Sequence, residues 1–444
     1  MEWFTRKLDE FTQLPHKAPL NPDGPEGYSP HQSMEYAVDS TYPSLDATVC
    51  HAILVTDEGS LRGPLPIRAG LIGAFLDRRA FQVDLRDHLI FPGLINAHDH
   101  LQLNAVPPLA AAGPFANSYE WIAACQSHFA QPEVIAARQV PKDLRLRHGA
   151  LKNLLAGTTC VAHHDEWHPV FQSTDFPVAV LRDYGWSYAL GYPQYGPPVR
   201  ESFAATPADQ PWMIHLAEGT DASAQAELEQ LEQLGCLAAN TVLIHGVGLR
   251  EPDIERVIAQ GAAVVWCPTS NHKLLQQSLD PRRLHAAGRL ALGSDSRLSG
   301  ARDLLEELRA VSGELDARQA LRLITSHAAR ILRLPTRGNL VPGALADLVI
   351  VENRGGSAAA NLVGIERSQI RAVVRGGTPR IADPDFAQWF AAAGVDTVRV
   401  MLDGKPKLLA KSLAEPALLA LEPGLKFDSR PAVQSAAAAG ARSC

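Results

Sequence analysis

The chain has 444 residues, of which 46% are hydrophobic and 20% are charged, as is typical of a soluble globular protein. The length exceeds one ordinary hydrophobic core, so we expect two domains, or a large barrel with an appendage. The net charge of −7 disfavours nucleic acid as a partner, because its recognition needs a basic surface. No apolar run reaches membrane-spanning length and no export signal is apparent, so we expect a cytoplasmic protein without membrane association.

The two flanks of the chain contain runs that predict β-strands. Residues 1–45 are rich in proline and predict an irregular arm with one short helix near 4–11. Residues 46–91 contain three strand-like runs separated by turn residues, and 336–400 contain strands in a similar style. We expect these two flanks to form one composite β-sandwich. The tail, 401–444, contains helix-like alanine-rich pieces and ends in a low-complexity run. The six cysteines are scattered and predict reduced packing residues.

The middle of the chain, 92–335, alternates between predicted strands and helices. Strands are expected at 212–216, 241–245, 262–267 and 290–293, and helices at 132–156, 221–234, 252–259, 303–311 and 317–332. Asp221 is the expected N-cap of its helix. This alternation predicts βαβ units on a parallel sheet, and the length suits a (β/α)₈ barrel. No convincing fourth barrel strand is apparent between Leu190 and Trp212.

A His-x-His pair marks the end of the first barrel strand. An apolar run ends in His98-Asp99-His100, and alternate side chains on a strand share a face, so the two imidazoles can bind one metal ion. The alternative is that they are polar residues that cap a buried strand. Asp99 is expected to point to the opposite face.

Three later strand ends favour the metal site. They carry His215, His245 and Asp295, and the carboxyl ends of parallel barrel strands meet at one face. Imidazoles and a carboxylate suit one Zn²⁺, with Fe²⁺ or Mn²⁺ as alternatives. Glu218 follows His215 and becomes a candidate proton shuttle if the chain turns inward after Leu216. Its alternative role is that of a carboxylate at a helix start.

The sequence resembles the metal-dependent amidohydrolase superfamily, in particular its branch of cytosine, guanine and adenosylhomocysteine deaminases and triazine hydrolases. The matching motifs are Pro-Gly-Leu-Ile-Asn-Ala-His-Asp-His (92–100), Gly-Thr-Thr (157–159), His-Leu-Ala-Glu (215–218), Ile-His-Gly (244–246), Cys-Pro-Thr-Ser-Asn (267–271), Gly-Ser-Asp-Ser (293–296) and Pro-Gly-Ala-Leu-Ala-Asp-Leu-Val (342–349). The resemblance implies a distorted (β/α)₈ TIM barrel beside a composite β-sandwich.

The resemblance also implies roles for single residues. The metal ligands would be His98, His100, His215 and Asp295, and the catalytic residues Glu218, His245 and Asp295. No lysine stands at a matching strand end, which favours one metal ion over two. Asp99 departs from the family motif, which has a small residue between the two histidines. Candidate substrate-binding residues are His163, His164, Gln102, Trp121 and Asn271. The two histidines are alternatively ligands of a second metal or exposed polar residues of a loop.

The implied activity is hydrolysis of a carbon–nitrogen bond other than a peptide bond. We expect an aminohydrolase that deaminates a small N-heterocycle through a metal-bound hydroxide, with a small-molecule substrate as its partner and with homo-oligomers possible. The alternatives are amide, urea or halide hydrolysis at the same site, or a catalytically silent binding protein with the same fold.

Overall fold

Parallel strands form the centre of the fold, as the alternation of strands and helices predicted. The computed structural model describes residues 45–110 and 113–428. Within them, one parallel sheet has the order β10-β9-β8 and another the order β11-β12-β13-β14-β15. The strands are β8 (Leu94–Asp99), β9 (Thr158–His163), β10 (Ala179–Val180), β11 (Gly185–Ala189), β12 (Trp212–Leu216), β13 (Thr241–His245), β14 (Ala263–Trp266) and β15 (Leu290–Leu292).

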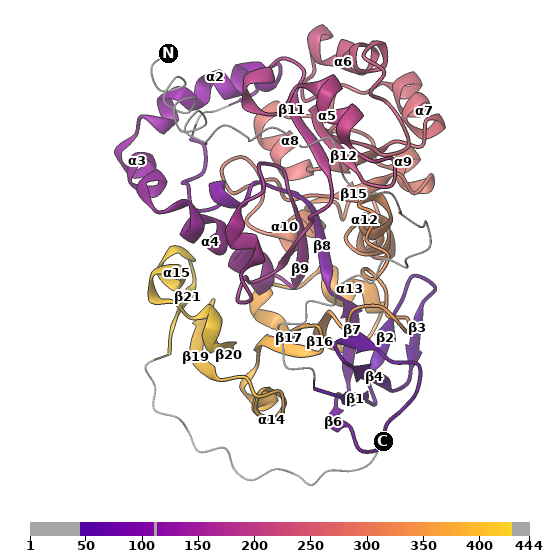
Figure 1. Ribbon diagram of the computed structural model, residues 1–444, viewed down its shortest axis with the longest axis vertical. Helices are drawn as coiled ribbons and strands as arrows, with labels where there is room; N and C mark the ends of the chain where they lie inside the picture. Colours follow the sequence, from indigo (N-terminus) through magenta and orange to yellow (C-terminus); the bar gives the residue numbers. More distant parts are fainter. Residues whose placement is uncertain (1–44, 111–112, 429–444) are drawn as a thin grey trace, which may run out of the picture. The chain divides into compact units, whose positions relative to one another are not determined.

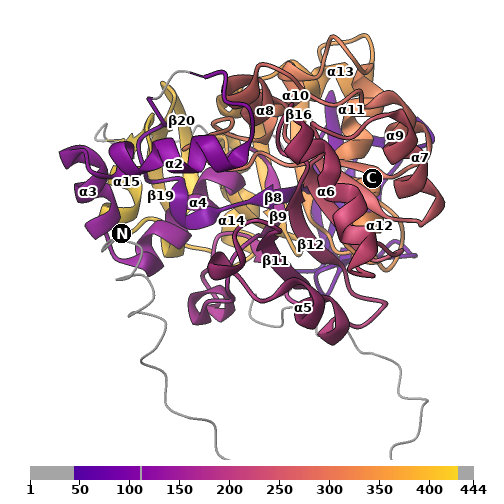
Figure 2. The ribbon, with the colours of Figure 1, turned by 90° about the horizontal axis from the view of Figure 1, so that it is seen from above.

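Helices alternate with these strands and lie outside them (Figure 1, Figure 2). They are α2 (Ser118–Phe129), α3 (Pro132–Gln139), α4 (Lys142–Leu155), α5 (Val199–Ala205), α6 (Ala222–Gln233), α7 (Glu251–Ala259), α8 (Pro268–Leu275), α9 (Arg282–Ala286), α10 (Leu304–Ala310), α11 (Ala317–Leu323) and α12 (Ser326–Ile331). The mixed α/β character of the predicted fold is therefore confirmed. No strand ladder in the described residues joins β10 to β11 or β15 to β8, so barrel closure stays a prediction.

Two predicted helices are each divided in the structure. The helix expected over 132–156 is split into α3 and α4 at Pro141, whose ring removes a backbone donor and excludes a continuous helix. The helix expected over 317–332 ends at Leu323, and Thr325 adopts a non-helical conformation before α12 begins. By contrast, the predicted N-cap is confirmed, since the Asp221 side chain accepts a hydrogen bond from Ala224 N at 3.0 Å.

The fourth parallel strand lies before Leu190, outside the stretch in which it was expected. It is β11, and it pairs with β12 so that Ala189 is opposite His215. The stretch between Leu190 and Trp212 instead contains a short 3-10 helix (Pro193–Tyr195) and α5. Because β11 is short and mixes polar with aromatic residues, the apolar run over 186–190 is ambiguous and does not by itself predict a strand.

Both flanks of the chain enter one antiparallel-rich sheet. Its order is β21-β19-β20-β18-β17-β16-β7-β2-β3, and β7 (His88–Pro92) pairs with β16 (Leu348–Glu352) so that Pro92 is opposite Leu348. The other members are β2 (Ile53–Val55), β3 (Ser60–Arg62), β17 (Ile370–Arg375), β18 (Thr378–Ala382), β19 (Thr397–Leu402), β20 (Lys405–Ala410) and β21 (Leu425–Phe427). A smaller sheet has the order β5-β4-β1-β6, from β1 (Ala47–Cys50), β4 (Leu65–Arg68), β5 (Leu71–Ile72) and β6 (Phe81–Asp84).

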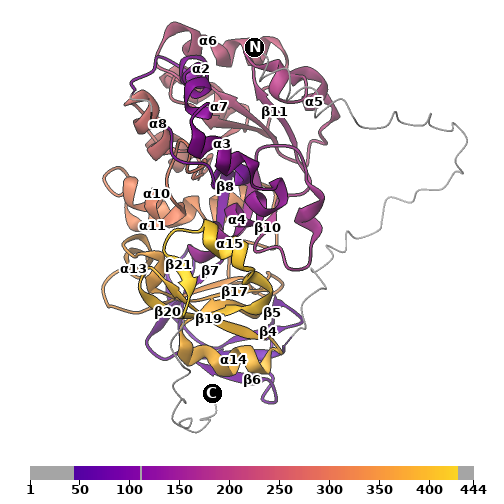
Figure 3. The ribbon, with the colours of Figure 1, turned by 90° about the vertical axis from the view of Figure 1, so that its left-hand side faces the viewer.

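The C-terminal strands extend this sheet beyond the expected end of the second flank. β19 crosses residue 400, and β20, α15 (Pro416–Leu421) and β21 follow it (Figure 3). Two further helices, α13 (Ala358–Val363) and α14 (Ala387–Ala392), precede them. The domain boundaries and the sandwich stay predictions. The helix expected at 4–11 and the low-complexity run at 436–439 lie outside the described residues.

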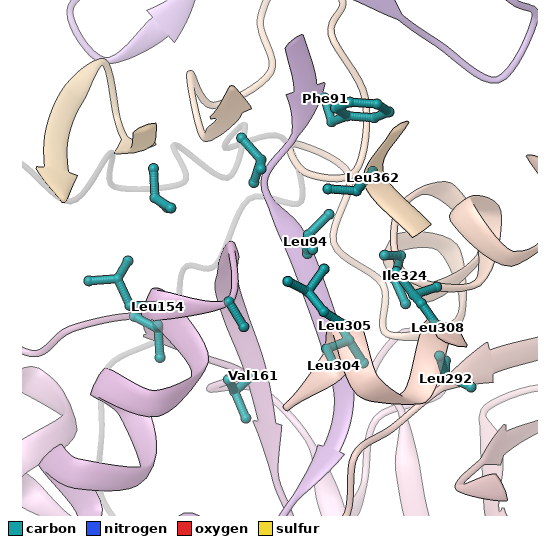
Figure 4. Close-up of a cluster of buried hydrophobic side chains, with 14 of the residues drawn as sticks. Phe91, Leu94, Leu154, Val161, Leu292, Leu304, Leu305, Leu308, Ile324 and Leu362 are labelled. Carbon is teal, nitrogen blue, oxygen red and sulfur yellow. The ribbon is translucent and has the colours of Figure 1, made fainter. Parts of the chain in front are cut away.

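The core is continuous around the first parallel strand. Leu94 of β8 is fully buried and packs near Leu304, Leu305 and Ile324 (Figure 4). Full burial of one such side chain contributes roughly 1.5–3 kcal/mol. Gly93 precedes it, and a Cβ there would lie 2.3 Å from the Thr159 Oγ1 atom, so the close approach of β8 and β9 requires glycine. The thiols of Cys125, Cys160, Cys236 and Cys267 are free and buried, as predicted for packing residues.

Candidate active site

Four of the predicted metal ligands converge at the ends of three parallel strands. His100 Nε2 lies 3.3 Å from His215 Nε2, and Asp295 Oδ1 lies 3.7 Å from His98 Nε2 and 3.8 Å from His100 Nε2. Ligand atoms that surround a zinc ion tetrahedrally at ~2.0–2.1 Å are separated by about 3.4 Å. The spacing of His98, His100 and Asp295 therefore fits a single divalent cation, and His215 adjoins this group through its contact with His100.

Burial and hydrogen bonding support the same conclusion. His98 is fully buried, and within the described residues neither of its ring nitrogens makes a hydrogen bond. Burial lowers the pKa of His98 to about 4, so the ring is neutral at physiological pH, the form that binds metal ions. A buried polar group without a partner is costly, and a cation would supply the missing interaction.

The carboxylate of the cluster is held in its ionised form. Burial opposes ionisation of Asp295, but the facing rings of His98 and His100 outweigh it and keep the pKa of Asp295 well below its usual range. Its second oxygen, Oδ2, accepts hydrogen bonds from the Ser270 hydroxyl at 2.9 Å and the Ser299 hydroxyl at 2.6 Å. These bonds fix the orientation of Oδ1 towards the histidines. Ser299 carries no sequence signal that could have identified it.

The backbone adopts left-handed conformations where the strands reach the site. Ala217, His245 and Asp295 have φ values of 53°, 75° and 53°. Such conformations cost roughly 1–3 kcal/mol in residues other than glycine and often mark functional sites. Ala217 directly follows the end of β12, and its amide donates to Glu227 Oε2 at 2.6 Å. The turn there brings Glu218 into the site, as the sequence analysis required.

Glu218 is buried between an indole and an imidazole. Its Oε1 accepts a hydrogen bond from Trp121 Nε1 at 2.9 Å and lies 3.8 Å from His245 Nε2. Burial is the main cause that raises the pKa of Glu218 to about 7; His245 and Trp121 oppose the rise, and Asp295 adds to it. A carboxyl group with this pKa can both take up and release a proton near neutral pH.

A hydrogen bond behind His245 sets its tautomer. Its Nδ1 donates to Asn271 Oδ1 at 2.9 Å, which leaves Nε2 facing Glu218. Asn271 also donates to the Ser278 hydroxyl at 3.2 Å. Asn271, predicted as a substrate contact, therefore contacts His245 and Ser278 in the structure.

Of the other predicted substrate residues, His164 contacts the histidine cluster directly. His164 stacks on His215 with ring centroids 4.3 Å apart and donates from Nε2 to the Ser187 carbonyl at 3.0 Å. His163 accepts through Nδ1 from the Leu101 amide at 3.3 Å. Gln102 donates to the Asp165 carboxylate. His164 also groups with His98 and His215 as possible metal ligands, with ligand atoms within 4.8 Å of one another.

Tyr188 is a site residue that the sequence analysis missed. Its carbonyl accepts a hydrogen bond from His215 Nδ1 at 2.8 Å, which directs His215 Nε2 towards the cluster. Its ring lies 4.9 Å from that of His215. Tyr188 belongs to β11, the strand that sequence patterns could not locate, so its position next to His215 could not be inferred either.

Imidazoles and a carboxylate at the ends of parallel strands, beside a buried acid, are the features of a metal-dependent hydrolase. Residues 194–405 match the model of the Amidohydrolase family, as the motifs predicted. Among the described residues, no helix is both long and apolar enough to cross a membrane.

Curated relatives carry names from the predicted branch. A 5-methylthioadenosine/S-adenosylhomocysteine deaminase of Halobacterium salinarum is 28% identical over 331 residues, which cover 61% of this chain and 74% of that protein. A protein of the same name from Thermococcus sibiricus is 30% identical over 158 residues, which cover 31% of this chain. The matched region spans only 37% of the length of that second relative.

A solved structure has a similar fold. The crystal structure of an adenosine deaminase from Xanthomonas campestris, with bound zinc, has a TM-score of 0.60 and 22% sequence identity. The alignment covers 79% of this chain and 97% of that one. This likeness supports an α/β fold of the TIM-barrel type.

Proposed function

We propose that the protein is a metal-dependent hydrolase that deaminates a small N-heterocycle, cleaving a carbon–nitrogen bond other than a peptide bond. The amidohydrolase family match and the deaminase names of the relatives support this proposal. The single observation that carries it is the group of His98, His100, His215 and Asp295 ligand atoms with the Glu218 carboxyl beside it. The fold would be a closed barrel beside a composite β-sandwich.

We propose His98, His100, His215 and Asp295 as the ligands of one divalent metal ion, with zinc as the first choice because three imidazoles and a carboxylate suit it. The bound ion would polarise a water molecule and lower its pKa towards about 7. Asp295 would also accept a hydrogen bond from that water. A cytoplasmic location and a homo-oligomeric state stay predictions.

Proton transfer in this proposal belongs to Glu218. The attacking water adds to the ring carbon that bears the amino group, and its proton passes to Glu218 Oε1. Glu218 then donates this proton to the departing nitrogen, which leaves as ammonia while the ring carbon keeps the water oxygen. His245, held by Asn271, stabilises charge that develops on the substrate through Nε2.

A screen for ammonia release across purine, pterin and pyrimidine compounds tests the proposal. Once a substrate is found, Glu218→Gln should lower kcat by roughly 10²- to 10⁴-fold, the usual contribution of a general acid–base group. Glu229→Gln, at an exposed position on α6, is the matched control and should retain full activity. If Glu218→Gln keeps most of the turnover, Glu218 has no role in the mechanism. If the wild-type protein binds no zinc after incubation with it, the proposed metal site is wrong.

A further inference from the structure

Asp99, between the two histidines of β8, has a buried partner of opposite charge. Its Oδ2 accepts hydrogen bonds from Lys152 Nζ at 3.0 Å and from Asn153 Nδ2 at 2.7 Å, and its Oδ1 accepts from Asn104 Nδ2 at 2.8 Å. Asp99 and Lys152 are both fully buried. The side chain thus points away from the histidine cluster and into α4, on which Lys152 and Asn153 lie.

Stability alone does not account for this ion pair. Taking two charges out of water costs free energy that their attraction often fails to recover, and apolar replacement of a buried pair is often neutral or stabilising. Lys152 Nζ donates to Asn104 Oδ1 as well, at 2.9 Å, so the ammonium group is fixed in direction by two acceptors. A buried charge held in one geometry is suited to fixing the position of what it binds.

The pair belongs to a polar network that joins the two segments carrying metal ligands. Asn96 of β8 donates to the Asn153 side chain at 2.9 Å and to the Ser294 hydroxyl at 2.7 Å, and its Oδ1 accepts from the Ser294 amide at 3.0 Å. Asn96 Nδ2 also lies 3.3 Å from Asp99 Oδ2. Ser294 directly precedes Asp295, so the network links α4 and β8 to the carboxylate ligand.

The polar network joins β8 to the segment after β15, where no strand pairing does so among the described residues. In the described residues β8 and β15 are not paired in a sheet, although both lead into the site. They are joined instead by the Asn96–Ser294 bonds and by the Asp295 amide, which donates to the His98 carbonyl at 3.1 Å. The relative position of the His98 and Asp295 side chains therefore depends on this backbone bond together with polar side chains that Asp99 and Lys152 hold in place.

We propose that Asp99 and Lys152 are positioning residues, whose ion pair sets the spacing of the metal-ligand atoms on β8 and after β15 and thereby the affinity for the metal. The inference rests on the proposed metal site. It assigns a role to the one residue of the His-x-His motif that departs from the amidohydrolase pattern. Neither residue touches the reacting atoms, so both act through His98, His100 and Asp295.

The test compares zinc affinity with folding stability in Asp99→Asn, Lys152→Met and the double variant Asp99→Asn/Lys152→Met. Zinc dissociation constants are measured by competition with a chromophoric chelator, and stability by thermal denaturation of the metal-free proteins. Loss of an outer hydrogen-bond partner typically weakens metal binding 10- to 100-fold. We expect about this loss in both single variants.

The double variant separates positioning from simple support of the fold. It leaves no unpaired charge, so its denaturation temperature should recover towards that of the wild type. Zinc affinity should stay about 10- to 100-fold weaker, because the fixed pair is still missing. The double variant also keeps the test decisive if a single variant fails to fold.

A second ion pair with a buried lysine supplies the control. Lys407 of β20 is buried and donates to the Asp383 carboxylate and to the Ile370 carbonyl, in the sheet of the flanks. Lys407→Met should lower the denaturation temperature and leave zinc affinity unchanged. Two results would overturn this inference but leave the proposed metal site intact. One is a zinc affinity within twofold of the wild type in the Asp99 and Lys152 variants. The other is a zinc affinity that recovers together with stability in the double variant. Absence of zinc binding by the wild type would overturn the proposed metal site itself.

Discussion

Glu307 of α10 gives the stability of the fold a pH dependence that can be isolated. Its side chain is fully buried; Oε2 accepts a hydrogen bond from the Thr269 amide at 3.2 Å, and within the described residues Oε1 has no partner. Burial is the main cause that raises the pKa of Glu307 from 4.5 to about 8. At 1.36 kcal/mol per pH unit, this change corresponds to about 5 kcal/mol.

The direction follows from linkage. Because the folded-state pKa is above the unfolded value, the stabilisation is fully present below pH 4.5 and is lost as the pH rises through about 8. Between about pH 5 and pH 7.5, the free energy of unfolding should fall by about 3 kcal/mol through this group. Glu307→Gln keeps the acceptor for Thr269 and cannot ionise, so it should remove this part of the pH dependence.

The assay is denaturant-induced unfolding of the metal-free protein at several pH values. The wild type should lose stability relative to Glu307→Gln at about 1.4 kcal/mol per pH unit over this range. Glu306→Gln, at the preceding half-buried position, is the control and should follow the wild type. Parallel pH dependences of the wild type and Glu307→Gln would refute the reasoning, since they would mean that burial does not retain the proton.

Four other changes have defined outcomes. Trp121→Phe removes the hydrogen-bond donor to Glu218, so the pKa of Glu218 should rise above about 7. The acidic limb of the pH profile of kcat/KM should then move to higher pH, and an unchanged limb would count against this contact. Asn271→Leu frees His245 Nδ1 and should lower kcat/KM roughly 10- to 100-fold with zinc content unchanged, as metal analysis would establish. Chelation should lower the denaturation temperature, and added zinc should restore it. Asn117→Ala removes the N-cap of α2 and should cost about 1 kcal/mol in denaturant unfolding.

Strand ends were predictable because polar residues interrupt apolar runs there. His215 is the penultimate residue of the buried strand β12, His245 ends the buried strand β13, and Asp295 follows the buried β15. The sequence marks such positions plainly, since a parallel strand with two covered faces is apolar until it reaches the site. The convergence of these residues then follows from the parallel arrangement.

The residues that support the metal-ligand cluster from behind could not be predicted, and the reason is again physical. Lys152 and Asn153 lie in a helix where charged and polar residues normally face water, and only the tertiary fold shows that both are fully buried. Tyr188 lies on a short strand whose apolar run is ambiguous in the sequence. Asp99 was recognised as a departure from the family motif, yet its explanation depends on a helix some fifty residues later, which sequence periodicity does not connect to it.

The pairing of β7 with β16 has a consequence for how the chain is made. During synthesis β7 emerges early, but the residues opposite it, around Leu348, follow only after all of the parallel strands. Until then β7 has an unpaired edge, and such edges invite association with other chains. The nascent protein therefore has a long interval in which an apolar strand is unprotected, and folding of the sheet should be slow and late because its contacts are distant in sequence.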